Sequence, residues 1–299
     1  MSYRLELTDP DIASALRRVA TEQLDDALEA LSGAEGEKVH ESVHEARKNV
    51  KKLRGALRLV RGAFPGYSAE NSYLRDAARL VSDLRDKQAM LESYDRVLSA
   101  APDVDGRKVL PLRRALESER DSALDAPEAA DRLVAFRTGL ETVREAVPDW
   151  SLKTDGWPAL EEGLKKTYGR GRGAMDEARQ ETTPATLHEW RKRVKYHWYH
   201  ARLLREAWPK AMKPHIKAAD HLSDLLGDRH DIDVLKPRVS AAEIDETAKV
   251  ALLAAMAAER ERLDAEAFAL GRVLYADKPK ALARRWGTWW SDAVLRAQA

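Results

Sequence analysis

Apolar residues recur along this chain at the three- and four-residue spacing that places them on one face of a helix. Between residues 11 and 31 this face is formed by Ile12, Leu16, Val19, Leu24, Leu28 and Leu31. Nowhere does an alternation of apolar and polar residues continue long enough to indicate a strand. The pattern therefore predicts an all-α protein.

Glycine and proline residues interrupt this pattern and set the expected ends of the helices. Two helices should stop where an aromatic residue meets a proline, at Phe64-Pro65 and at Trp208-Pro209. Further breaks are expected at Gly227, Pro237 and Pro279. The predicted helices cover about 11–31, 44–64, 70–99, 108–124, 127–146, 157–178, 184–207, 214–226, 230–239, 245–275 and 279–297.

One segment of the chain occurs twice. Aligning residues 43–65 with residues 187–209 gives 11 identities in 23 positions, at an offset of 144. A repeat of this period indicates two copies of one structural unit, each close to half of the chain. We expect one domain over residues 1–299, made of repeat 1 (about 9–150) and repeat 2 (about 151–299), folded as two pseudo-symmetric antiparallel bundles of four-helix type.

The composition agrees with a helical protein and limits the chemistry that it can carry. Hydrophobic residues make up 44% of the 299 residues, with eight Trp and eight Tyr, so a substantial core can form. Cysteine is absent, which excludes disulfides and thiolate metal sites and favours a reducing compartment. No apolar stretch is long enough for a signal sequence or a membrane span. A soluble, cytoplasmic protein without membrane contact is expected.

The net charge is only +1, but the charges are distributed unevenly along the chain. Residues 44–61 contain seven Lys and Arg against one Glu, and residues 188–205 contain six against one. The rest of the chain has 38 basic and 48 acidic residues, a net charge of −10. Positive charge is thus concentrated in the two copies of the repeated segment, and a local patch matters more than the total because salt screens exposed charges beyond about 8 Å.

On a helix these basic residues form one stripe opposite the apolar face, about 25 Å long in the first copy. Like charges one turn apart repel, so such a stripe is unfavourable unless an anion faces it. A solvated face making surface ion pairs is the simpler alternative for one copy, but two copies in the same register favour a site for phosphate groups. The predicted contacts are His44, Arg47, Lys48, Lys51, Lys52, Arg54 and Arg58, with His188, Arg191, Lys192, Lys195 and Arg202.

A second shared element follows each stripe. Arg85-Asp86 and His230-Asp231 occupy matching positions at an offset of 145. Each Asp could orient a basic residue of the stripe, which would leave Arg85 and His230 to face the anion. An ion pair that only shapes the fold is the alternative.

These motifs resemble the CHAD family, the conserved histidine α-helical domain, over nearly the whole chain. The resemblance is carried by two copies of His-x-x-Arg followed by basic residues, beginning at His44 and His188, and by the elements at 85–86 and 230–231. It implies two four-helix bundles that bind inorganic polyphosphate in a basic cavity between them, and an association with polyphosphate granules. The chain departs from the family pattern at Trp198, which replaces a base, and at Arg202, which replaces an acid.

Two other functions compete with polyphosphate binding. RNA is also a polyanion, and Tyr196, Trp198 and Tyr199 are possible stacking residues, whereas Trp190 and Trp208 lie on the apolar face and are expected in the core. A metal-dependent phosphohydrolase would use several histidines, but His197 and His200 do not share the face of His188. We therefore expect a binding protein that is not an enzyme, with no metal and no cofactor.

Overall fold

The computed structural model describes residues 3–32, 36 and 38–298. Within these ranges the chain is helical and contains no strand, so the predicted all-α fold is confirmed. The helices are α1 (Ile12–Ser32), α2 (Lys38–Leu59), α3 (Tyr67–Leu80), α4 (Ser82–Ser99), α5 (Gly106–Leu124), α6 (Ala129–Ala146), α7 (Gly156–Gln180), α8 (Pro184–Leu203), α9 (Pro209–Ala241), α10 (Glu246–Leu274) and α11 (Pro279–Gln298). Two 3-10 turns, Val147–Asp149 and Arg205–Ala207, complete the chain.

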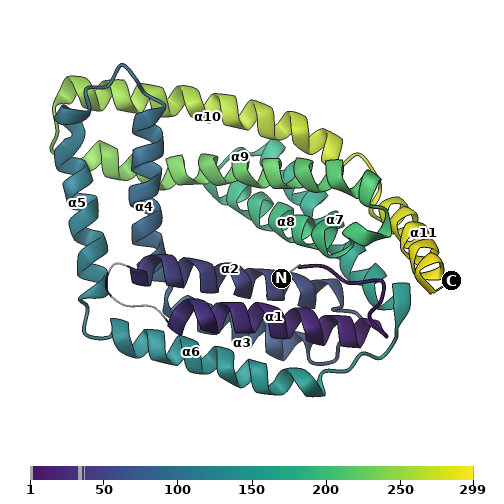
Figure 1. Ribbon diagram of the computed structural model, residues 1–299. Helices are drawn as coiled ribbons and strands as arrows, with labels where there is room; N and C mark the ends of the chain where they lie inside the picture. Colours follow the sequence, from purple (N-terminus) through teal and green to yellow (C-terminus); the bar gives the residue numbers. More distant parts are fainter. Residues whose placement is uncertain (1–2, 33–35, 37, 299) are drawn as a thin grey trace.

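The helices form two groups that lie above one another in Figure 1. In the lower group, α1 packs against α2 and α6, and α3 packs against α2 and α6. In the upper group, α8 lies between α7 and α9, α10 follows α9, and α11 packs on α7. Each group thus contains the helices of one half of the sequence. The pseudo-symmetry between the halves stays a prediction.

A helical hairpin of α4 and α5 stands across the end of both groups, and α4 contacts both α2 and α9 (Figure 1). The sequence pattern predicted one helix over residues 70–99, which is wrong. The helix ends at Leu80, and Val81 leaves helical geometry at φ −109° and ψ 18°. Because the Val81 side chain is fully buried, the break is fixed by packing and not by a glycine or proline that the sequence would reveal. This turn lets α4 carry Arg85 toward the second group of helices.

The breaks predicted at Gly227 and Pro237 are also wrong, since α9 is one continuous helix of 33 residues. Proline inside a helix removes one backbone hydrogen bond but does not always end the helix. The missing side chain of Gly227 serves packing: a Cβ atom there would lie 3.3 Å from Nη2 of Arg191. The glycine therefore makes room for the guanidinium of a stripe residue.

Two tryptophans, Trp190 and Trp208, were expected in the core. Trp190 is fully buried and stacks on Phe268, with ring centroids 5.1 Å apart, as expected. The prediction for Trp208 is wrong, because its side chain is 48% exposed and meets Trp289 edge-on. Helix α8 ends at Leu203, so Trp208 no longer follows the apolar face that the longer predicted helix would have given it.

Glycines allow α2 to approach the second group closely. A Cβ atom on Gly55 would lie 2.9 Å from Cβ of Tyr199 in α8. A Cβ atom on Gly163 in α7 would lie 1.8 Å from the carbonyl oxygen of Leu59 in α2. These contacts bring the two basic helices α2 and α8 side by side, which is the condition for a shared site.

The close crossing of α2 and α7 gives a direct test of this packing. Gly163→Ala should lower the free energy of unfolding by about 1–3 kcal/mol, because the methyl group meets backbone that no rotamer change can move. Gly173→Ala, on the same helix, has nothing within 4 Å and should raise stability by up to about 1 kcal/mol through helix propensity. Urea denaturation of both variants measures the difference, and equal stabilities would contradict the assigned packing.

Candidate anion-binding site

The two basic helices meet at Lys51. Part of its side chain remains in contact with water, but its ammonium group lies among protein atoms that reduce its hydration. Four other cations face it: Arg47 on its own helix, Arg85 of α4, and Arg191 and Lys195 of α8. Burial, followed by repulsion from these cations, lowers the pKa of Lys51 to about 8. We name these five residues the cationic cluster. Three helices from distant parts of the sequence contribute to it.

Few carboxylates contact the cationic cluster directly, although Asp86, Asp220 and Asp224 act on it through their charge. Arg85 pairs with Glu92 at 3.0 Å, and Arg47 donates a hydrogen bond to the carbonyl oxygen of Ala78. Within the described part of the chain, Lys51, Arg191 and Lys195 have no carboxylate oxygen within 4.0 Å. Buried donor atoms without a partner remain, at Nε of Arg47 and Nη1 of Arg85. Unpaired cationic donors at this density are suited to an anion with several oxygens.

Aromatic rings extend the basic surface along α8. The Lys195 ammonium lies 4.0 Å from the ring centre of Trp198, and the Arg202 guanidinium lies 4.8 Å from it. Arg202 also stacks near Tyr3, at 5.3 Å. After burial, Arg202 is the main cause that lowers the pKa of Lys52 on α2. Trp198, which replaces a base of the family pattern, thus holds two cations in place.

The first stripe continues past the crossing into a group of arginines. Arg58 lies over the ring of Tyr196 at 3.8 Å, and Arg54 donates to Asn71 at 3.2 Å. Burial and neighbouring cations lower the pKa of Arg61 to about 10. The structure adds three basic residues to this end that were not predicted as contacts: Arg61, Arg170 and Arg193. Arg61 could have been found, because it is one of the identities of the repeat, aligned with Arg205.

His188 and His230 lie together, with ring centroids 4.5 Å apart. Burial and the neighbouring His230 ring lower the pKa of His188 to about 4, so both rings are neutral near pH 7. With Asp86 they line a cavity of about 470 Å³ between α4, α5, α8 and α9. Residues of both copies of the second shared element, Asp86 and His230, therefore lie together at the site.

The two aspartates of this element, Asp86 and Asp231, have different partners. Burial lowers the pKa of Arg47, and the charge of Asp86 opposes this effect, in keeping with the expected orienting role. For Asp231 the structure favours the alternative of an ion pair that shapes the fold, because Asp231 pairs with Arg96 of α4 at 2.9 Å and not with a stripe residue. Arg96 also pairs with Asp228 at 2.7 Å, so Asp231 joins α4 to α9.

The remaining predicted contacts lie at the outer edge. His44, Lys48 and Lys192 are exposed. Lys48 pairs with Glu45, and Lys192 pairs with Glu189, each one helical turn away. These carboxylates reduce the attraction of both lysines for an anion, so the interior of the stripes is more strongly cationic than their edge.

The other histidines belong to the core. His197 and His200 are fully buried, and Nε2 of His197 lies 2.8 Å from Nε2 of His215. Among the residues that the structure describes, no group of three or more His, Asp or Glu could hold a metal ion. Within the same residues, no helix is both long enough and apolar enough to cross a membrane.

Histidines whose pKa is lowered in the folded protein make its stability depend on pH. The folded protein lowers the pKa of seven histidines, so the unfolded chain, with histidine pKa near 6.5, binds protons first. Stability is therefore complete above pH 6.5 and is lost as the pH falls toward 4. A single histidine whose pKa falls to about 4 contributes about 2 kcal/mol over this range, so we expect the free energy of unfolding to be lower by at least that much at pH 5 than at pH 7.5. Urea titrations at both values test this, and equal stabilities would contradict it. The seven histidines with a lowered pKa are His40, His44, His188, His197, His200, His215 and His230.

Comparison with known proteins identifies a family that shares this fold. A family model described as the CHAD domain matches residues 18–240. The chain is also similar to the crystal structure of the CHAD domain from the plant Ricinus communis, at 19% sequence identity and a TM-score of 0.62. That similarity covers 92% of this chain and 96% of the plant chain, and it shows a shared fold. A search of curated proteins finds no match.

Proposed function

The chain belongs to the CHAD domain family, and from this premise we propose that it binds inorganic polyphosphate in a basic groove along α2 and α8. Proteins of this family are associated with polyphosphate binding in general. The proposed floor of the groove is the cationic cluster. Lys52 and Arg202 extend it on one side, and Arg54 and Arg58 on the other.

The observation that supports this most strongly is the environment of Lys51. Five cations from three helices converge there with one direct carboxylate pair among them, Arg85 with Glu92, while Asp86, Asp220 and Asp224 act on the cluster through their charge alone. Such an arrangement is unfavourable in the free protein, since like charges repel and partly buried cations lose hydration. An anion that carries many phosphates removes the repulsion at every position along the stripe. A single small anion would reach only part of it.

We propose binding without turnover, in the cytoplasm and on polyphosphate granules. The features that support the proposal are charge, partial burial and unpaired donors, which hold a phosphate chain but do not by themselves activate a nucleophile. A fluorescent fusion in cells that accumulate polyphosphate should collect on the granules. A uniform distribution in such cells would contradict the granule part of the proposal.

RNA is the second candidate, and the aromatic residues argue against it. Tyr199 is 2% exposed and lies at the crossing of α2 and α8. Trp198 and Tyr196 are already covered by cations, Lys195 and Arg58 respectively. At these three positions the ring is either buried or already in contact with a cation of the protein, which disfavours base stacking. Phosphate contacts alone would not distinguish RNA, so a direct comparison is needed.

The test compares long-chain polyphosphate, single-stranded RNA and pyrophosphate at several salt concentrations. We expect polyphosphate to bind most tightly, and its affinity to fall linearly with salt on a logarithmic scale, as several counterions are released. Equal affinity for RNA of matched charge would overturn the specific proposal. Release of orthophosphate from polyphosphate in the presence of divalent metal would instead support a phosphohydrolase.

A further inference from the structure

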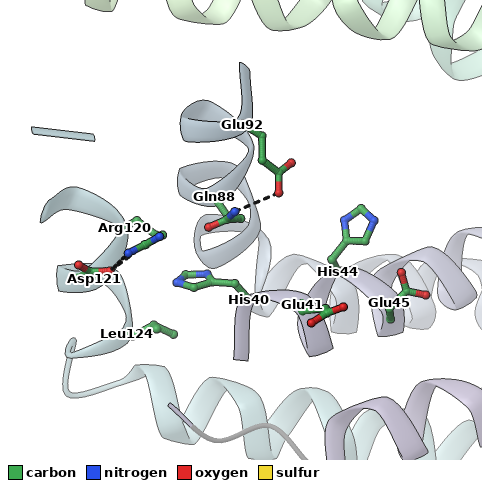
Figure 2. Close-up of a pocket in the computed structure, with 9 residues that line it drawn as sticks. All are labelled: His40, Glu41, His44, Glu45, Gln88, Glu92, Arg120, Asp121 and Leu124. Carbon is green, nitrogen blue, oxygen red and sulfur yellow. Dashed lines mark hydrogen bonds and ion pairs between the residues drawn. The ribbon is translucent and has the colours of Figure 1, made fainter. Parts of the chain in front are cut away.

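A second cavity, of about 500 Å³, lies beside the basic stripe between α2, α4 and α5. Figure 2 shows its lining, with the His40 ring between α2 and the side chains of Arg120 and Asp121 on α5. His44 belongs both to this lining and to the stripe. The cavity therefore adjoins the proposed groove but has different walls.

His40 is the unusual residue of this cavity. It is 6% exposed, and its Nδ1 atom lies 3.3 Å from the carbonyl oxygen of Leu84. A carbonyl only accepts hydrogen bonds, so Nδ1 must carry the proton and Nε2 must present a lone pair. Nε2 is buried and has no partner. An unsatisfied buried acceptor is unfavourable, and it indicates a donor that is missing from the cavity.

The remaining lining groups favour a donor with positive charge. Four carboxylates line the cavity, and three of them have a cation partner: Asp121 pairs with Arg120 at 2.7 Å, Glu45 with Lys48, and Glu92 with Arg85. Glu92 pairs with Arg85 and accepts from Gln88 at 3.1 Å, whereas Glu41 has no ion pair within the described residues. Glu41 is therefore the carboxylate of this lining that is left to pair with a bound cation. The four carboxylates are Glu41, Glu45, Glu92 and Asp121.

Burial lowers the pKa of His40, which keeps the ring neutral and its lone pair available near pH 7. The apolar side chain of Leu124 forms another part of the lining. The lining thus offers a buried acceptor, one unpaired surface carboxylate and an apolar wall. These features match a short chain of methylenes with an amino group at each end. The carboxylates and histidines do not converge as a metal site would require.

We propose that this cavity binds a short aliphatic polyamine, with one ammonium group donating to Nε2 of His40 and another near Glu41. The methylene chain would lie against Leu124. The site would work without polyphosphate, and its test is therefore independent of the proposed groove. When both sites are filled, a polycation and a polyanion would lie next to one another at His44.

Calorimetric titration of the full chain with putrescine, in the absence of polyphosphate, tests the proposal. We expect saturable binding that Glu41→Gln weakens about fivefold and His40→Leu weakens more than tenfold. Glu41 is exposed, so its variant tests the site even where the His40 substitution disturbs folding. Glu181→Gln removes an exposed carboxylate on the far group of helices and should bind like the unchanged protein.

Three results would overturn the proposal. The first is the absence of saturable binding of putrescine. The second is equal binding by the unchanged protein and by Glu41→Gln. The third is binding of Mg²⁺ as tightly as putrescine, since a site built for charge alone would not need the lone pair of His40.

Discussion

Replacing Lys51 and Arg191 together with glutamine should weaken the binding of long-chain polyphosphate about 100-fold at physiological salt. Each residue offers a charged donor without a carboxylate partner in the described structure. A charge-assisted hydrogen bond in such a setting is worth about 1.5 kcal/mol or more, which is about tenfold in affinity for each residue. Because the two residues come from α2 and α8, the double variant tests both halves of the proposed groove. Equilibrium binding measured by fluorescence anisotropy or calorimetry gives the change.

The substitution is expected to leave the fold intact, because removing one of several repelling cations relieves strain in the free protein. A matched control removes the same charge elsewhere: Lys165 and Lys213 are exposed on α7 and α9, and Lys165→Gln with Lys213→Gln should weaken binding only slightly. A loss as large as that of the first pair would mean that total charge, and not the cluster, governs affinity. An unchanged affinity in the Lys51 and Arg191 variant would refute the site.

Arg229→Met should lower the free energy of unfolding by about 3–5 kcal/mol. Arg229 lies on α9 and is 1% exposed, and its guanidinium pairs with Asp233 and, at 2.9 Å, with Asp264 of α10. Removing the arginine leaves two carboxylates in a partly buried position with only Arg260, 3.4 Å from Asp233, to neutralise them. Breaking a buried pair on one side is far more destabilising than the pair itself is stabilising. The loss should affect the packing of α9 on α10.

Arg262→Met provides the matched control for this substitution. Arg262 lies on α10 and also pairs with two carboxylates, Glu259 and Glu266, both at 2.7 Å, but its side chain is 55% exposed. Its removal should change stability by less than about 1 kcal/mol, because water screens the exposed pairs. Urea denaturation of both variants at pH 7.5 compares them. Similar losses would show that burial does not set the strength of the Arg229 network.

Local sequence signals located most of the helices. The helix expected at 157–178 is α7 (Gly156–Gln180), and the one expected at 279–297 is α11 (Pro279–Gln298). Proline at a first helical turn and the apolar spacing carry this information along the chain itself. The break at Val81 and the continuity of α9 through Gly227 depend instead on partners far away in sequence. Propensity rules therefore failed at these two places.

Most residues of the candidate site could be predicted from the sequence, but the contacts between them could not. The repeat identified Lys51, Arg191 and Lys195 as basic positions on matching helix faces. It could not show that the two helices pack against one another. Arg85 was expected at the site from the second shared element, but the sequence did not reveal that it would come from a separate helix, α4. The pairing of Asp231 with Arg96 was out of reach for the same reason, since it depends on how α4 meets α9. The spacing of residues shows which of them share a face of a helix, but only the folded structure shows which helix faces contact one another.

The most direct test of the central claim is the pKa of Lys51, measured by NMR titration of its side chain with and without saturating polyphosphate. In the free protein we expect a pKa near 8, because burial and four neighbouring cations disfavour the charged ammonium. Phosphates at the cationic cluster reverse this effect, so the pKa should rise to about 10.5 or higher, with uptake of a proton on binding near pH 8. A Lys51 pKa that stays near 8 while polyphosphate is bound would show that the chain binds elsewhere.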